Sequence, residues 1–268
     1  MGRIGERFRS LRARDEGALV PFITAGDPDL RTTERLLHAL AESGADAIEI
    51  GVPFSDPTAE GPTIQRSSER ALGSGASLRR ILELVRCHRA SLDVPLILMG
   101  YANSFLTMGG KAFADAAVSA GVDGVIVVDL PPEEGEEFYG ELTAQDVDPI
   151  LLASPTTTPE RARMLARGTR GFLYYVSLTG VTGARTEVAL DVEESVHAIR
   201  RLADVPICVG FGVATPEHVR RVGAFADGVV VGSALVDRID SATTADAAVD
   251  AAARFVAELK APLLPQNR

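Results

Sequence analysis

Short apolar runs alternate with amphipathic stretches along this 268-residue chain, and the alternation constrains the fold more than any other feature. Eight runs have the length of strands, and the stretches between them have helical spacing. This pattern is typical of βα units with a parallel sheet. The expected strands are residues 19–24, 47–51, 95–100, 124–129, 149–153, 171–177, 206–210 and 228–232. The expected helices include 30–43, 78–91, 111–120, 159–166, 192–203 and 216–223.

The predicted strands are continuously apolar, as in Val125-Ile126-Val127-Val128, which is the pattern of strands buried on both faces. A doubly wound open sheet shares this property. Eight units and a length of 268 residues favour a single (β/α)8 barrel of the TIM type. We therefore expect one domain over residues 1–268, with an extra N-terminal helix.

Composition excludes several classes of partner. A formal net charge of −10 and a pI near 5.0 argue against nucleic acid and anionic membranes, which require a basic face. Residues 1–16 lack the apolar core of a signal peptide, and no apolar run approaches the length of a membrane span. Cys87 and Cys208 form neither a metal motif nor a disulfide framework. A cytoplasmic protein with small ligands is expected.

One predicted strand carries an acidic residue. Glu49 lies between Ile48 and Ile50, and the loop that follows contains Asp56 and Glu60. An ionised carboxylate is costly to bury unless it is paired or used, so packing explains Glu49 poorly. Barrel enzymes build their active sites where the strands end. We therefore interpret Glu49 as a catalytic acid/base.

Polar and aromatic residues close several other predicted strands, among them Phe22, Tyr101, Asp129 and Tyr174. Taken singly, Asp129 is explained as a loop cap and Tyr101 as a core aromatic. Because the carboxyl ends of parallel strands meet at one edge, their convergence favours a shared substrate site.

Glycines follow the last two predicted strands. Gly212 follows one strand and Gly232-Ser233 the other, while Gly183 closes the long loop before them. Barrels often bind a phosphate at this corner through backbone N–H groups. A Gly-Phe-Gly sequence alone is more typical of a turn. Together with Gly232 and a short helix starting at Ser233, it predicts a phosphate site.

The basic residues narrow the chemistry further. The two lysines, Lys111 and Lys260, fall in predicted helices, so no strand end offers an amine for a Schiff base. The four histidines also fall in helical stretches and lack metal-ligand spacing; they are His38, His88, His197 and His218. Carboxylate acid/base catalysis on a phosphorylated small molecule is the remaining chemistry.

Several motifs, in a fixed order, resemble the tryptophan synthase alpha subunit family. They are residues 21–28 (PFITAGDP), 49–65 (EIGVPFSDPTAEGPTIQ), 127–131 (VVDLP), 180–183 (GVTG), 210–212 (GFG) and 232–236 (GSALV). The family pattern has aspartate at position 60 and a larger apolar residue at 58, where this chain has Glu60 and Thr58.

The resemblance implies a barrel that cleaves indole-3-glycerol phosphate to indole and glyceraldehyde 3-phosphate, with no metal or organic cofactor. It implies that Glu49 handles the protons and that Glu60 binds the indole N–H. Thr182 matches the loop threonine that steadies the carboxylate at position 60. Residues expected to bind the substrate are Phe22, Tyr101, Asp129, Tyr174, Thr182 and Phe211, with Gly183, Gly212, Gly232 and Ser233 around the phosphate.

The resemblance also implies a partner, the pyridoxal-phosphate-dependent beta subunit, in an alpha2beta2 assembly. Pro53, Asp56 and Asn103 match the interface. Three alternatives remain open: a stand-alone lyase, a non-catalytic subunit that binds ligand and activates its partner, and another phosphate-binding barrel such as a sugar-phosphate epimerase.

Overall fold

All eight expected strands are present, and one of them is divided into two. The computed structural model describes residues 2–177, 186–202, 204–210 and 212–265, and only the backbone of 186–191. Within these residues the strands pair in parallel in one sheet, in the order β5-β4-β3-β2-β1-β9-β8-β7-β6. The strands are β1 (Ala18–Thr24), β2 (Ile48–Gly51), β3 (Leu96–Gly100), β4 (Gly124–Val127), β5 (Asp148–Pro149), β6 (Leu152–Ala153), β7 (Leu173–Val176), β8 (Ile207–Gly210) and β9 (Gly228–Val231).

The two strands at the ends of this order, β5 and β6, belong to one short segment, so the sheet closes into a barrel. β5 pairs with β4, and β6 pairs with β7. Between them, the N–H of Ile150 donates to Val125 and the carbonyl of Leu151 accepts from Tyr174. The segment is divided because it passes from one neighbouring strand to the other within six residues. The expectation of a (β/α)8 barrel is confirmed.

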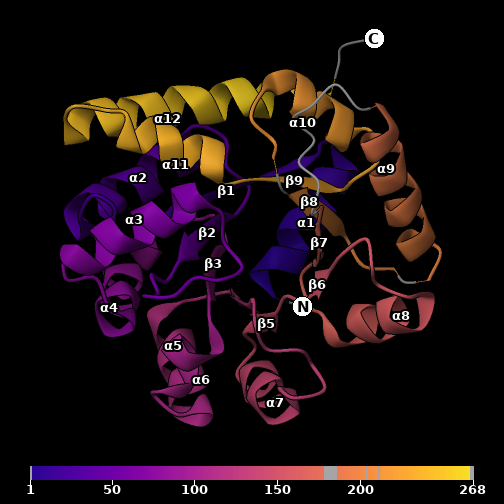
Figure 1. Cartoon of the computed structure of the whole chain (residues 1–268), viewed down its shortest axis with the longest axis horizontal. Coiled ribbons are helices and arrows are strands. Elements are labelled where there is room, and N and C mark those ends of the chain that lie inside the picture. Colours follow the sequence, from indigo (N-terminus) through magenta and orange to yellow (C-terminus); the bar gives the residue numbers. More distant parts are fainter. Residues whose placement is uncertain (1, 178–185, 203, 211, 266–268) are drawn as a thin grey trace.

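Helices α2 to α12 surround the strands in Figure 1, whereas α1 does not. The helices are α1 (Arg3–Ala13), α2 (Leu30–Glu42), α3 (Pro62–Gly73), α4 (Leu78–His88), α5 (Ala102–Leu106), α6 (Gly110–Ala120), α7 (Glu136–Ala144), α8 (Pro159–Gly168), α9 (Thr186–Arg200), α10 (Pro216–Gly223), α11 (Ser233–Asp240) and α12 (Ala245–Lys260), with short 3-10 turns at Arg89–Ser91 and Ala261–Leu263. No helix in the described part of the chain is long and apolar enough to cross a bilayer.

The expected N-terminal helix, α1, closes one end of the barrel. In Figure 1 it lies within the outline of the ring of strands. Its apolar face presents Ile4, Phe8 and Leu11, which pack against interior residues of the strands, including Val20 and Ile97. The strands' outward side chains form a separate core with the outer helices. Helix α1 therefore fills the barrel interior at one end, and a substrate site is expected at the opposite end.

Aspartates just before the strands stabilise the end of the barrel that α1 closes, which is called the scaffold end. Asp46 accepts a hydrogen bond from the N–H of Leu19 at 2.8 Å and pairs with Lys260 at 2.8 Å. Asp123 likewise accepts from the N–H of Leu96 and pairs with Arg3 and Arg89. The two carboxylates are buried and paired, as expected for the end of the barrel that serves as scaffold.

Candidate active site

Glu49 lies inside the barrel near the carboxyl end of β2. It pairs in register with Phe22 of β1 and Ile97 of β3. Alternate strand residues share a face, so Glu49 points to the same interior as Ala47. Its exposed fraction is 0%, and neither carboxylate oxygen has a hydrogen-bond partner among the described residues. An unpaired buried carboxyl group is rare, so Glu49 is a candidate for the functional group of this site.

Burial raises the pKa of Glu49 to about 8, and the nearby charge of Glu60 adds to the rise. The cause is desolvation, which disfavours the ionised form. Near neutral pH Glu49 therefore holds a proton that it can donate. Tyr174 of β7 is also buried in the interior, and the pKa of its phenol is raised by burial and by Glu49 and Glu60, so this hydroxyl stays neutral.

Glu60 lies in the loop between β2 and α3. The side chain is half-buried, and burial raises its pKa. Two side chains hold this loop: the hydroxyl of Tyr101 accepts from the N–H of Ala59 at 2.9 Å, and Gln65 donates to the carbonyl of Glu60 at 2.9 Å. The ring of Tyr101 also stacks on Phe54, with centroids 5.0 Å apart. The structure thus brings Tyr101 and Glu60 together.

A cavity of about 10 Å³, room for a single water, lies between these elements. Its lining includes Phe22, Glu60 and Tyr101 from the predicted site. Thr24, Ile64, Ser68 and Met99 also line it. Met99 was not among the predicted site residues, although it lies on β3 two residues from Ile97, which is paired with Glu49, and so faces the same interior.

The two glycines that follow β8 and β9 allow close backbone approach at the predicted phosphate corner. Gly212 has a φ of 75°, a left-handed conformation that favours glycine. Gly232 caps the expected short helix, α11, which starts at Ser233. The first N–H groups of a helix lack intrahelical acceptors and attract anions. A Cβ at Gly232 would lie 3.7 Å from Phe22, so this corner adjoins the cavity.

The remaining predicted residues divide into three groups. Thr182, Gly183 and Phe211 lie outside the described residues. Asp129 is exposed and accepts a hydrogen bond from the N–H of Ala102 at 2.7 Å, at the start of α5, so it has a capping role beside any role toward substrate. Of the three predicted interface residues, Pro53 is buried, whereas Asp56 and Asn103 are exposed.

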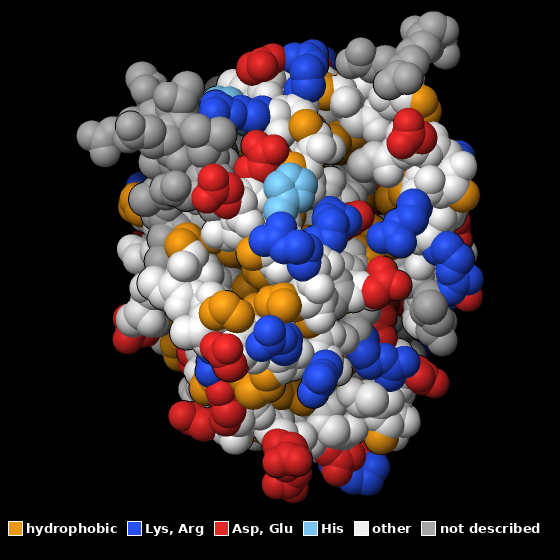
Figure 2. Space-filling view, turned by 90° about the vertical axis from the view of Figure 1, so that its right-hand side faces the viewer, with side chains coloured by type: hydrophobic (Ala, Val, Ile, Leu, Met, Phe, Trp, Pro, Cys, Tyr) orange, Lys and Arg blue, Asp and Glu red, His pale blue; other side chains and the backbone are white. Residues whose placement is uncertain are grey.

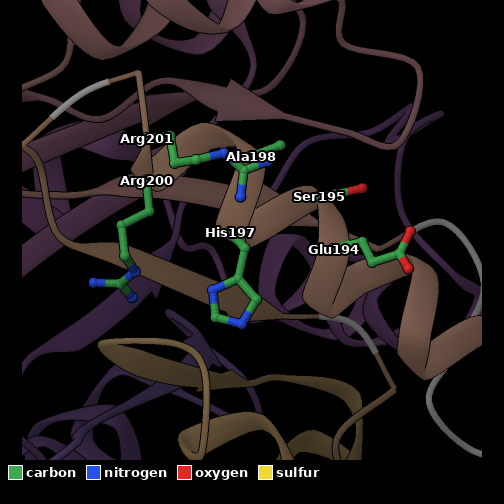
Figure 3. A pocket seen from close by; sticks show the side chains of 6 residues that line it. All are labelled: Glu194, Ser195, His197, Ala198, Arg200 and Arg201. Atoms are coloured by element: carbon green, nitrogen blue, oxygen red, sulfur yellow. The ribbon is translucent and has the colours of Figure 1, made fainter.

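The larger hollows lie elsewhere. Figure 3 shows one on α9, lined by Glu194, Ser195, His197, Ala198, Arg200 and Arg201. Arg200, at the C-terminal end of α9, pairs with Asp227, which precedes β9, so this edge of the hollow is at the scaffold end. The flank of the molecule that carries α8, α9 and α10 has basic and acidic side chains interspersed (Figure 2), without a field of one sign.

A closed parallel barrel with an interior carboxyl group and tyrosine near the carboxyl ends of its strands defines a (β/α)8-barrel enzyme, because this fold places its active sites there. A family model described as "Tryptophan synthase alpha chain" matches residues 8–263. The chain belongs to the tryptophan synthase alpha chain family.

Individual relatives agree over almost the whole chain. The tryptophan synthase alpha chain of Geobacter sulfurreducens is 52% identical over 260 residues, which cover 97% of this chain and 98% of the relative. The structure of the alpha subunit from Legionella pneumophila str. Paris is 40% identical, with a TM-score of 0.91 and 98% of each chain covered. A structure of Mycobacterium tuberculosis tryptophan synthase has a TM-score of 0.90 at 35% identity and covers 99% of each chain.

Proposed function

We propose that the chain is a lyase that cleaves indole-3-glycerol phosphate to indole and glyceraldehyde 3-phosphate, as the alpha subunit of tryptophan synthase. The observation that carries the proposal is Glu49, a fully buried carboxyl group with no described partner and a pKa near 8, near the carboxyl end of β2. Family membership supports the same activity.

In the proposed mechanism Glu49 moves the protons. Indole is a poor leaving group as a carbanion, so Glu49 first protonates the ring at C3, and the positive charge reaches the ring nitrogen. Glu60 stabilises that charge by accepting a hydrogen bond from the ring N–H. The C3–C3′ bond then breaks, its electron pair restores the aromatic ring, and the C3′ hydroxyl proton returns to Glu49 as the aldehyde forms. A group with a pKa near the working pH suits both transfers.

Other residues bind the substrate in this proposal. Phe22, Tyr101 and Tyr174 contact the indole and glycerol parts, and Asp129, Thr182 and Phe211 complete the pocket. Backbone N–H groups near Gly183, Gly212, Gly232 and Ser233 bind the phosphate. The exposed start of α11 and the left-handed Gly212 support this placement.

We propose that neither a Schiff base nor a metal takes part. Lys260 is bound to Asp46 at the scaffold end, and Lys111 is exposed on α6 beside Asp115, so neither lysine lies on a strand. The four histidines lie on the outer helices α2, α4, α9 and α10. The site residues of this chain supply carboxyl and hydroxyl groups instead.

We further propose one domain over residues 1–268, a cytoplasmic location, and a beta-subunit partner in an alpha2beta2 assembly. Pyridoxal phosphate would belong to the partner. Pro53, Asp56 and Asn103 would lie at the interface. Asp56 is exposed in the loop that carries Glu60, and Asn103 is exposed on α5. Binding of the beta subunit would therefore order this loop and raise the rate of cleavage.

Indole release from indole-3-glycerol phosphate, followed with and without a matching beta subunit, tests the proposal. Release that rises strongly with the partner supports the synthase subunit, and strong release by the isolated chain supports a stand-alone lyase. No release in either condition contradicts a lyase. The longer side chain of Glu60 then favours the second candidate function, a ligand-binding activator of the beta subunit.

Tyrosine 101 should influence the rate through the loop. Tyr101→Phe removes the acceptor for the N–H of Ala59, a contact worth about 1 kcal/mol. We expect kcat to fall about fivefold if the whole of this contribution is lost from the transition state, because about 1.4 kcal/mol corresponds to a factor of ten in rate. Steady-state kinetics measure this. Tyr139→Phe is the matched control, because it removes a hydroxyl that bonds to Leu130 outside the cavity; equal losses in the two variants would contradict the prediction.

A further inference from the structure

Helices α3 and α11 lie side by side. They connect the two halves of the proposed site, which are the loop that carries Glu60 and the phosphate corner. α3 begins one residue after Gly61, so its first turn follows Glu60 directly. α11 begins at Ser233, at the proposed phosphate corner. A displacement of either helix therefore moves one half of the site relative to the other.

A hydrogen bond joins the two helices close to Glu60. The hydroxyl of Thr63 donates to the carboxylate of Asp237 at 3.0 Å. Thr63 is three residues after Glu60, and Asp237 is four residues after Ser233. Arg66 lies 3.9 Å from the same carboxylate. The bond is exposed, so its contribution to overall stability is small, but it fixes the first turn of α3.

Apolar contacts lie beneath this bond. Ile64 of α3 and Val236 of α11 form a buried cluster with Phe22 of β1. Phe22 in turn reaches the end of β2, because a Cβ on Gly51 would lie 2.5 Å from its ring. Close-packed groups of this kind transmit a displacement instead of absorbing it. The connection therefore runs from α11 to the strand that carries Glu49.

A further ion pair holds the C-terminal half of α3. Arg70 binds Asp27 through two hydrogen bonds of 2.8 Å and Asp240 of α11 at 3.1 Å. Asp27 is buried in the loop after β1. With Arg70 held at one end and Thr63 at the other, α3 is fixed against α11 along its length. The short loop that carries Glu60 forms hydrogen bonds with Tyr101 and Gln65, and Thr63 joins the helix that follows it to α11.

We propose that Thr63 and Asp237 are positioning residues that couple phosphate binding at α11 to the placement of Glu60. The inference rests on the proposed function, because it assigns the phosphate and the indole N–H to these two places. A phosphate at the start of α11 holds that helix still, the Thr63–Asp237 bond transfers the restraint to α3, and Glu60 is held against the ring.

Kinetics of Thr63→Val, Asp237→Asn and the double variant test the coupling. We expect kcat for indole release to fall about three- to tenfold in each single variant and no further in the double variant, because one bond is lost in all three. The inhibition constant of inorganic phosphate should change less than twofold. Thr63→Ser, which keeps the hydroxyl, should restore kcat. Asp246→Asn is the control: it breaks the exposed ion pair between Asp246 of α12 and Arg35 of α2, and it should leave kcat unchanged. An additive double variant or an unchanged kcat would overturn the proposal.

Hydrogen–deuterium exchange tests the coupling without catalysis. The N–H groups of Ala59 and Glu60 are bonded to Tyr101 and to Pro57, so their exchange reports opening of the loop. Inorganic phosphate should slow this exchange in the wild-type protein and not in Thr63→Val. Equal slowing in both proteins, or none in either, would overturn the coupling, whereas failure of the lyase assay alone would leave this result standing.

Discussion

Glu49→Gln should lower indole release from indole-3-glycerol phosphate by about 10²- to 10⁴-fold, the usual contribution of a positioned acid/base group. Glutamine has nearly the same shape as glutamate but neither gives nor accepts the proton that the reaction requires. Because the carboxyl group of Glu49 has no described hydrogen-bond partner, the replacement breaks no such contact. KM should change little, so the loss should be in kcat.

The decisive comparison is with Glu137→Gln, the same change on the exposed surface of α7, which should leave the rate unchanged. Circular dichroism and melting would show that Glu49→Gln is folded. A folded Glu49→Gln protein with more than about a tenth of the wild-type kcat would contradict the acid/base role, since so small a loss falls below the range for such groups.

The role of Glu49 could be predicted from the sequence because burial and charge conflict at its position. The apolar neighbours Ile48 and Ile50 require a buried strand, and a carboxyl group within it calls for an explanation. The strands were predicted for the same reason, since strands buried on both faces are continuously apolar. The division of residues 149–153 was not predicted, because it depends on which neighbours the chain meets when the barrel closes.

The contacts that hold Glu60 could not be read from the sequence. Tyr101 lies 42 positions from Ala59, and Thr63 lies 174 positions from Asp237. Nothing in their local sequence indicates that these side chains meet. The meeting of the predicted site residues on strands could be read from the strand ends, because a parallel barrel brings those ends together. The residues that position the loop were not, because their meeting depends on how α3 and α11 pack.

The stability of the wild-type protein relative to Glu49→Gln should fall as the pH rises from about 5 to above 8. The pKa of Glu49 is near its ordinary 4.5 in the unfolded chain and about 8 in the folded protein. Between these values the folded state holds a proton that the unfolded state has released, so each rise in pH favours unfolding. Below pH 4.5 both states are protonated, and above about 8 the full penalty of the buried charge is present.

The penalty should be on the order of a few kcal/mol, since one pKa unit corresponds to about 1.4 kcal/mol. Urea unfolding of both proteins at pH 5, 6, 7, 8 and 8.5 measures it as the difference between their free energies of unfolding. Asp148, whose pKa is raised to about 6 by burial, is present in both proteins and cancels in that difference. If the difference between the two free energies of unfolding does not change across this pH range, Glu49 ionises as easily in the folded protein as in the unfolded chain. Glu49 would then be ionised near neutral pH and would not hold the proton that C3 requires.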